Sequence, residues 1–151
     1  MKLLTLFLLA ILISSCNNND SGKAQDQDTT INLVEIKATD LCFQRLEGTK
    51  NQDTTTITLK IAADEVNGVM NSVPKEKDSR KGTLKGQKHG DVIKALWSYK
   101  QEGKDDTLSV EFKLTENGLL QKSFEIDKIT QKQYLSAKSK FSIPFMKIAC
   151  K

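Results

Sequence analysis

From residue 39 onward, apolar and polar side chains alternate with a period of two, which is the pattern of strands that bury one face. In the clearest run, Ile93, Ala95, Trp97 and Tyr99 share one face. The same period recurs over residues 57–61, where threonines fill the alternate positions, and over residues 108–114. These runs predict strands whose apolar faces meet in a common core.

Short polar segments separate the runs and predict the connections between strands. Turns are expected at 88–91 and 102–106, and the Asn117-Gly118 pair favours a hairpin. Residues 72–79 predict a longer loop. Further strands are expected at residues 39–47, 66–71, 82–86 and 119–124.

Many short strands joined by tight turns indicate an all-β domain. We predict an antiparallel meander of about seven or eight strands that resembles a lipocalin-like barrel or half-barrel. A β-sandwich is the alternative, because the same turn spacing fits it.

The C-terminal region is less regular. Residues 127–138 allow one short helix capped by Asp127, although its apolar face contains little more than Ile129, Tyr134 and Leu135. Residues 141–148 are expected to form the last strand, and Pro144 places that strand at a sheet edge.

The N-terminus has a different pattern. Lys2 precedes residues 3–13, which are apolar apart from Thr5 and too short to span a bilayer, which needs about 20 residues. Residues 1–15 therefore read as a signal peptide. Ile13-Ser14-Ser15-Cys16 resembles the lipobox of bacterial lipoproteins, which implies that Cys16 is lipidated. An ordinary secretory signal with an incidental Cys16 is the alternative.

Residues 16–30 are polar and offer almost nothing to bury, so they predict a flexible tether that reaches roughly 20 Å. Residues 31–151 are then one β-rich domain. The resemblance implies a lipid-anchored protein of the cell envelope, with the membrane as its partner through Cys16. Asn17 after the cysteine favours the outer membrane, on its periplasmic face or at the cell surface.

The charge excludes one class of partner. A formal net charge of +4 from 23 basic and 19 acidic residues is a mild excess of mixed sign, not a nucleic-acid footprint. The basic stretch 75–81 is expected to be a solvated loop, with contact to anionic lipid or polysaccharide as the alternative.

Two cysteines remain after Cys16. Outside the cytoplasm, Cys42 and Cys150 are most simply a disulfide that joins the first strand to the end of the chain. Two buried free thiols are the alternative. No metal-ligand spacing is present, and no cofactor is expected.

Candidate sites are few. Trp97, Tyr99 and Phe112 lie on predicted inner faces, where they either line a ligand cup or fill the core. The only histidine, His89, falls in a predicted turn and is not expected to be catalytic. The sequence predicts no enzyme.

Four short pieces, 42–48, 82–86, 102–103 and 110–112, are similar to small uncharacterised lipoproteins of Bacteroidetes-type bacteria, a resemblance that implies no activity. The leading hypothesis is a non-enzymatic envelope lipoprotein that binds a small apolar ligand or an envelope partner. The alternative is a structural or interaction lipoprotein with a filled core and no ligand.

Overall fold

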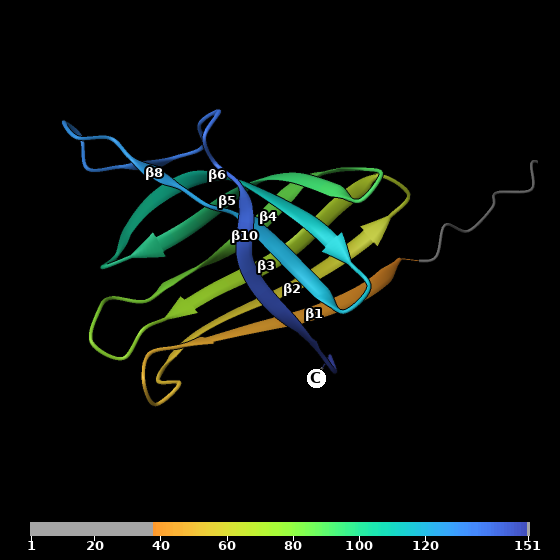
Figure 1. Ribbon diagram of the computed structural model, residues 1–151, viewed down its shortest axis with the longest axis horizontal. Coiled ribbons are helices and arrows are strands. Elements are labelled where there is room, and N and C mark those ends of the chain that lie inside the picture. The colour runs from red at the N-terminus through yellow and green to blue at the C-terminus, as the bar shows by residue number, and fades with distance from the viewer. Residues whose placement is uncertain (1–37, 151) are drawn as a thin grey trace, which may run out of the picture. The chain divides into compact units, whose positions relative to one another are not determined.

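A computed structural model describes residues 38–150 (Figure 1). The predicted signal peptide, the lipidation site Cys16 and the tether lie outside the described residues. The described strands are β1 (Thr39–Glu47), β2 (Asp53–Ala62), β3 (Glu65–Val73), β4 (Arg80–His89), β5 (Val92–Gln101), β6 (Lys104–Thr115), β7 (Gly118–Lys122), β8 (Glu125–Ile126), β9 (Gln133–Tyr134) and β10 (Phe141–Ile148).

The main sheet closes on itself. Its strands follow the order β1-β10-β7-β6-β5-β4-β3-β2, and β2 pairs with β1 to complete an antiparallel barrel of eight strands. The predicted all-β meander and its lipocalin-like barrel are thus confirmed, and the sandwich alternative is wrong. Every strand of the barrel has a neighbour on each side, so residues 38–150 contain all that the closed sheet requires.

The connections divide the barrel into two ends. The cup end carries the segments 48–52, 74–79, 102–103 and 123–140, on the left in Figure 1. The closed end carries the short turns 63–64, 90–91 and 116–117, together with the start of β1 and the end of β10. Both ends of the described chain therefore leave the barrel at the closed end.

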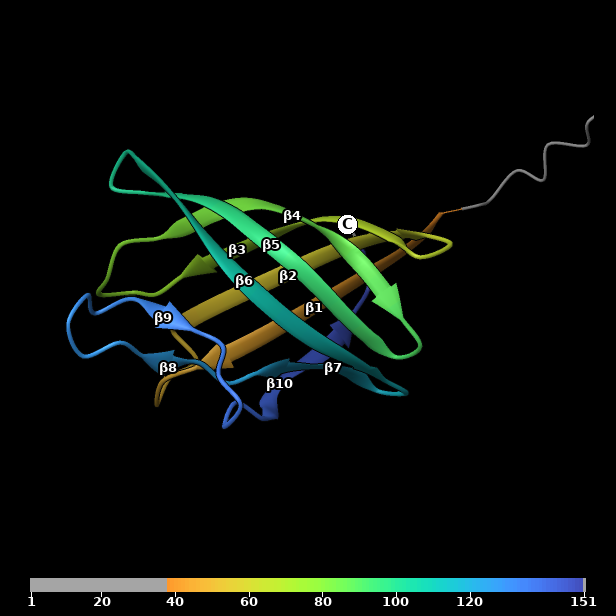
Figure 2. The same ribbon diagram turned by 90° about the horizontal axis from the view of Figure 1, so that it is seen from above.

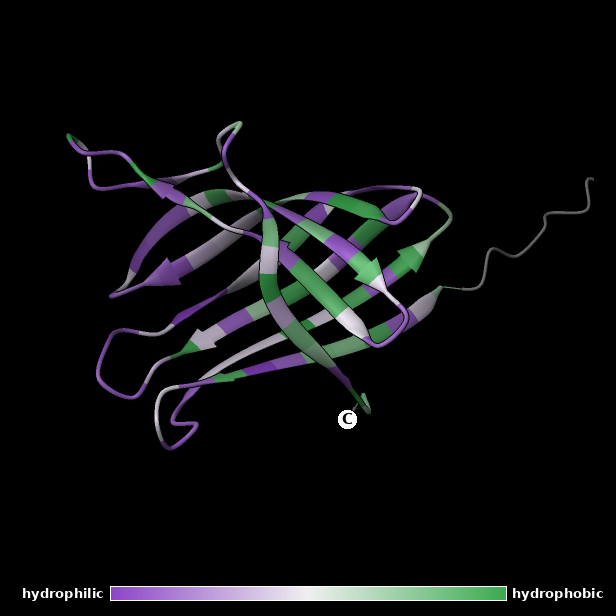
Figure 3. Cartoon of the chain, viewed as in Figure 1, coloured by the Kyte–Doolittle hydropathy of each residue, from purple (hydrophilic) through white to green (hydrophobic). Residues whose placement is uncertain are grey.

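Alternation along the strands builds the core, and Figure 3 shows it as alternating hydrophobic and hydrophilic positions. On β5, the exposed fraction is 0% at Ile93, 9% at Ala95, 2% at Trp97 and 9% at Tyr99, as the period of two predicts. The side chains fully enclosed toward the closed end include Leu59, Val66, Leu84, Val110, Phe112 and Leu119.

Glycines allow strands to approach closely at several points. An added Cβ at Gly82 would lie 2.0 Å from the carbonyl oxygen of Ser98 on β5, and one at Gly68 would lie 2.3 Å from that of Thr58 on β2. Contacts this short are not tolerated by real Cβ atoms. The glycines are therefore required by the packing of neighbouring backbones.

The predicted disulfide is present. Cys42 on β1 bonds to Cys150 across 108 residues of sequence, with the two Cα atoms 5.2 Å apart. The bond ties the strand that begins the barrel to the segment that follows its last strand, at the closed end.

Two predictions for the C-terminal region need correction. Residues 38–150 contain no helix, and the segment from Asp127 is instead the turn of the small hairpin β8–β9. Asp127 accepts hydrogen bonds from the N–H groups of Ile129 and Thr130, as a cap would, but only one turn follows. Ile129 is 93% exposed, so the sparse apolar face had nothing to pack against.

The last strand is also not a sheet edge, because β10 pairs with both β7 and β1. Pro144 pairs with Leu120 of β7, whereas the ladder to β1 involves only Met146, Lys147 and Ile148. The proline therefore lies in the part of β10 that has no partner on the β1 side, which accommodates its missing N–H.

Candidate functional site

The barrel is filled toward its closed end and hollow toward the other. A cup of about 400 Å³ opens at the cup end. Apolar side chains from four strands line it: Met70 of β3, Trp97 of β5, Leu108 of β6 and Phe145 of β10. This volume falls within the range of small-molecule sites.

Trp97 is held in place by the backbone. Its indole N–H donates to the carbonyl oxygen of Met70 at 3.0 Å, in a buried hydrogen bond. Its ring lies against that of Tyr99, with centroids 4.4 Å apart and planes tilted by 34°. The aromatic surface in the cup is therefore fixed before any ligand arrives.

The three predicted ligand residues have different places. Trp97 lines the cup. Tyr99 packs on Trp97 but does not line that cavity, and Phe112 is 0% exposed in the filled part of the core.

Polar side chains surround the opening of the cup. Arg45 and Glu47 come from β1 and form an ion pair with 2.6 Å between Nη2 and Oε1. Lys77 and Asp78 come from the 74–79 loop, and Arg80 from the start of β4. The charged lining is thus three cations and two anions.

Arg80 is fixed by neutral groups. Its Nε donates to Oε1 of Gln101 at 2.8 Å, and its Nη1 donates to Oε1 of Gln133 at 2.9 Å. The guanidinium carbon lies 5.4 Å from the centroid of the Tyr99 ring, within the range of a cation–π contact.

Gln121 is the most enclosed polar side chain of the cup. It is only 4% exposed and comes from β7. Within residues 38–150, its amide makes no hydrogen bond to protein. Every fully buried side-chain polar atom of this region has a hydrogen-bond partner, so an amide without one must retain contact with solvent. The amide is therefore accessible from the cavity.

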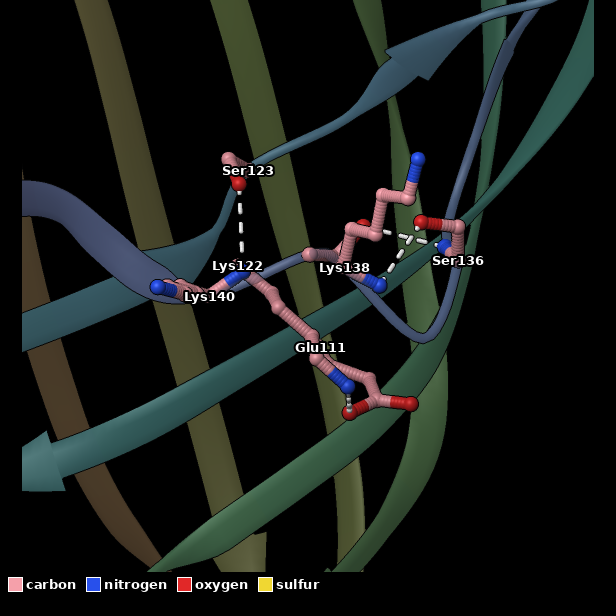
Figure 4. A network of polar contacts seen from close by, with 7 residues as sticks. Glu111, Lys122, Ser123, Ser136, Lys138 and Lys140 are labelled. Carbon is pink, nitrogen blue, oxygen red and sulfur yellow. Dashed lines mark hydrogen bonds and ion pairs between the residues drawn. The ribbon is translucent and has the colours of Figure 1, made fainter.

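Residues 123–140 form a strap that leaves β7, runs beside the opening of the cup and returns as β10 (Figure 2). Ser123 and Lys140 close its base with two hydrogen bonds, from Ser123 N to Lys140 O at 2.8 Å and from Lys140 N to Ser123 Oγ at 3.1 Å (Figure 4). Phe124, the residue after Ser123, lines the cup.

The strap also contacts the barrel wall farther out. Gln133 bonds to Arg80, and Nζ of Lys132 lies 3.6 Å from Oδ2 of Asp106 on β6. The N–H of Thr107, and then the charges of Lys132 and Arg80, lower the pKa of the Asp106 carboxyl below its ordinary value. These contacts join the strap to β4 and β6.

Arg45 and Arg80 were not among the sequence candidates. Both lie in register with inward-facing residues, Arg45 two positions after Phe43 and Arg80 four positions before Leu84. The period of two therefore places both side chains inside the barrel. For Arg80, the basic composition of the stretch 75–81 favours a loop instead.

Residues 38–150 hold no group of three His, Cys, Asp or Glu side chains placed to bind a metal ion. No helix in this described part is long and apolar enough to cross a membrane. His89 is exposed at the closed end, far along β4 from Arg80.

Comparisons with protein-family models, curated proteins and solved structures found no match to this chain. The function is therefore inferred from the cup itself.

Proposed function

We propose that this protein is a non-enzymatic, lipid-anchored protein of the cell envelope whose barrel binds a small molecule in the cup. The observation that carries the proposal is the cavity of about 400 Å³ above Met70, Trp97, Leu108 and Phe145. A barrel with a purely structural role gains stability by filling such a space with side chains.

The lining indicates the kind of molecule. Apolar and aromatic side chains form the inner part of the cup, and charged or amide groups surround its opening. A ligand with an apolar body and at least one polar end satisfies both regions, because burial of apolar surface supplies affinity and the polar groups fix orientation. This refines the predicted apolar ligand to an amphipathic one.

The proposed localisation of the protein is based on its N-terminal sequence. Cys16 within a lipobox-like segment supports lipidation and membrane anchoring, at the outer membrane. The experiment is radiolabelled fatty-acid incorporation into the full chain and into Cys16→Ala, in a bacterial host that processes lipoproteins. Equal labelling of both chains would contradict the anchor.

Ligand binding is tested on residues 31–151, which contain all the strands of the described region and both cysteines of the disulfide. Native mass spectrometry of protein purified from an oxidising compartment is compared with its denatured mass. An additional non-covalent mass is the expected result.

A matched pair of variants locates that mass. Ser72→Phe places a ring in the cup, whereas Ser109→Phe adds the same ring on the exposed face of β6. The mass should vanish only in Ser72→Phe. A bare chain in every spectrum would favour the alternative, a structural or interaction lipoprotein.

A further inference from the structure

We infer that the ligand of the cup is an amphipathic organic anion whose carboxylate binds Arg80. This inference rests on the proposed function and names the ligand class for the same site. The observation behind it is a partly buried guanidinium that is held rigidly but has no carboxylate partner.

The local geometry sets Arg80 apart from the other cations of the opening. Arg45 already pairs with Glu47, and Lys77 is an exposed loop residue. Among residues 38–150, no carboxylate forms an ion pair with Arg80. Its two hydrogen bonds go to the amide oxygens of Gln101 and Gln133, which carry no charge.

Two carboxylates share the surroundings of Arg80, and they are otherwise engaged or exposed. Asp106 senses the charge of Arg80 through space, but its ion pair is with Lys132. Asp78 also lines the cup, from an exposed position in the 74–79 loop. The guanidinium therefore retains an unbalanced charge beside a partly enclosed cavity, where an anion would be favoured.

The donors of Arg80 are not exhausted. A guanidinium carries five N–H bonds, and two of them are occupied by the glutamines. The remaining N–H bonds can donate to a carboxylate, whose planar fork they match. Stacking on Tyr99 and the two glutamine contacts hold the group in place, so little side-chain entropy remains to be lost on binding.

The apolar part of such a ligand has a place within the same cup. Tyr99 contacts both Arg80 and Trp97, and Arg80 and Trp97 both line the cup. An anion on Arg80 directs an attached alkyl chain toward Trp97, Leu108 and Phe145. The enclosed amide of Gln121 lines the same cup and offers a further hydrogen bond.

The test compares two probes that differ only in the head group. Decanoate and 1-decanol are titrated into residues 31–151, and the fluorescence of Trp97, the only tryptophan, reports on the cup. We expect decanoate to bind about tenfold more tightly than decanol. A difference of this size is what one charge-assisted hydrogen bond at a partly exposed site adds to the binding free energy.

Variants assign the preference to one residue. Arg80→Gln is expected to remove the preference for decanoate, because it weakens decanoate binding about tenfold more than decanol binding. An unchanged circular dichroism spectrum of the variant would show that the barrel is intact. Lys77→Gln is the matched control, since it removes one positive charge from the same opening without removing a held guanidinium, and it should keep the preference. Gln133→Ala, on the strap, releases one support of Arg80 and should reduce the preference by a smaller factor.

The outcomes separate the two proposals. Binding of both probes with equal affinity would overturn the anionic ligand and leave the binding cup in place. Equal loss of preference in Lys77→Gln and Arg80→Gln would overturn the assignment to Arg80. If neither probe alters Trp97 fluorescence and native spectra show a bare chain, the binding function itself fails.

Discussion

The indole N–H of Trp97 donates to the carbonyl oxygen of Met70 and so joins β5 to β3 across the intervening strand β4. Gly82 of β4 pairs with Met70 on one side and with Tyr99 on the other. The intervening strand thus has no side chain at the position that pairs with Met70, whereas Trp97 itself pairs with Leu84. The bond depends on a close fit of three strands at the base of the cup.

Replacing Trp97 with Phe is expected to destabilise the barrel by about 1–3 kcal/mol, because the variant loses a buried hydrogen bond and leaves unfilled space. Urea denaturation followed by circular dichroism measures the effect. Tyr134→Phe, which changes a 44% exposed aromatic of β9, serves as the control and should unfold with the wild type. Coincident curves for Trp97→Phe and wild type would show that the bond adds no stability.

Gly82→Ala is expected to cost about 3 kcal/mol or more, since the new methyl group meets backbone atoms of β5 that cannot move independently. Gly90→Ala is the matched comparison. Gly90 has a φ of +61° in an open turn with nothing near its Cβ position, so only backbone strain of about 1–2 kcal/mol is expected. In thermal melts, Gly82→Ala should therefore lower the melting temperature more than Gly90→Ala does. A smaller decrease for Gly82→Ala than for Gly90→Ala would contradict close strand packing at Gly82.

Removing the disulfide is expected to lower stability by up to about 4–5 kcal/mol, the chain-entropy limit for a loop of this size. The Cys42→Ser/Cys150→Ser double variant and the reduced wild type should melt alike, both below the oxidised protein. Intact mass provides the check on the bond, since oxidised protein lacks two thiol hydrogens. If reduction leaves the melting temperature unchanged, the link contributes nothing to the barrel.

The turn of the strap should loosen in acid. Hydrogen bonds from the N–H and hydroxyl of Thr130, and from the N–H of Ile129, lower the pKa of Asp127 from its ordinary value of 3.8. A lowered pKa means that the carboxylate stabilises the turn above the ordinary value, and that this contribution disappears as the pH falls through the lowered pKa. Protection of the Thr130 amide from hydrogen exchange, relative to its intrinsic rate at the same pH, should therefore fall below about pH 4.

Two substitutions distinguish the charge of Asp127 from its role as an acceptor. Asp127→Asn keeps an acceptor oxygen and should retain the turn without the acid transition. In Asp127→Ala, the Thr130 amide should have low protection from hydrogen exchange at every pH. If the acid transition persists in Asp127→Asn, a titrating group other than Asp127 causes it.

Gln121→Leu should leave stability unchanged or raise it by about 1 kcal/mol, because an amide without a protein partner is replaced by an apolar group of similar size. Binding of any ligand that hydrogen-bonds to the amide should weaken at the same time. Gln87→Leu, on the exposed part of β4, controls for added hydrophobicity and should show neither effect. Urea midpoints and probe titrations measure both, and a large loss of stability in Gln121→Leu would reveal a structural role.

The sequence predicted the strands best where alternation was strong. The run from Ile93 to Tyr99 buries the face that the period of two assigns to it, and the hairpin at Asn117-Gly118 is present, with Gly118 packed under the backbone of Phe145. A period of two does not distinguish a closed barrel from a sandwich, because both bury one face of each strand. That choice was decided by the pairing of β10 with β1, a contact between the two ends of the domain.

The cup was harder to foresee for a related reason. Trp97 and Phe112 have the same pattern in sequence, yet Trp97 lines the cavity and Phe112 is enclosed in the core. Their difference depends on distance along the barrel axis, which alternation does not report. Arg80 was missed because a charged residue at the end of a basic run resembles part of a loop. Its side chain nevertheless lies on the inward face of β4, because it is an even number of residues from Leu84.

Both ends of the described chain lie at the closed end of the barrel, and this gives the molecule a direction. The chain enters the barrel at Thr39 and leaves it after Ile148, so an attachment through either end meets the barrel opposite the cup. The opening is thereby separated from both points at which the described chain continues. A fusion partner added at either end is expected to leave the cup accessible.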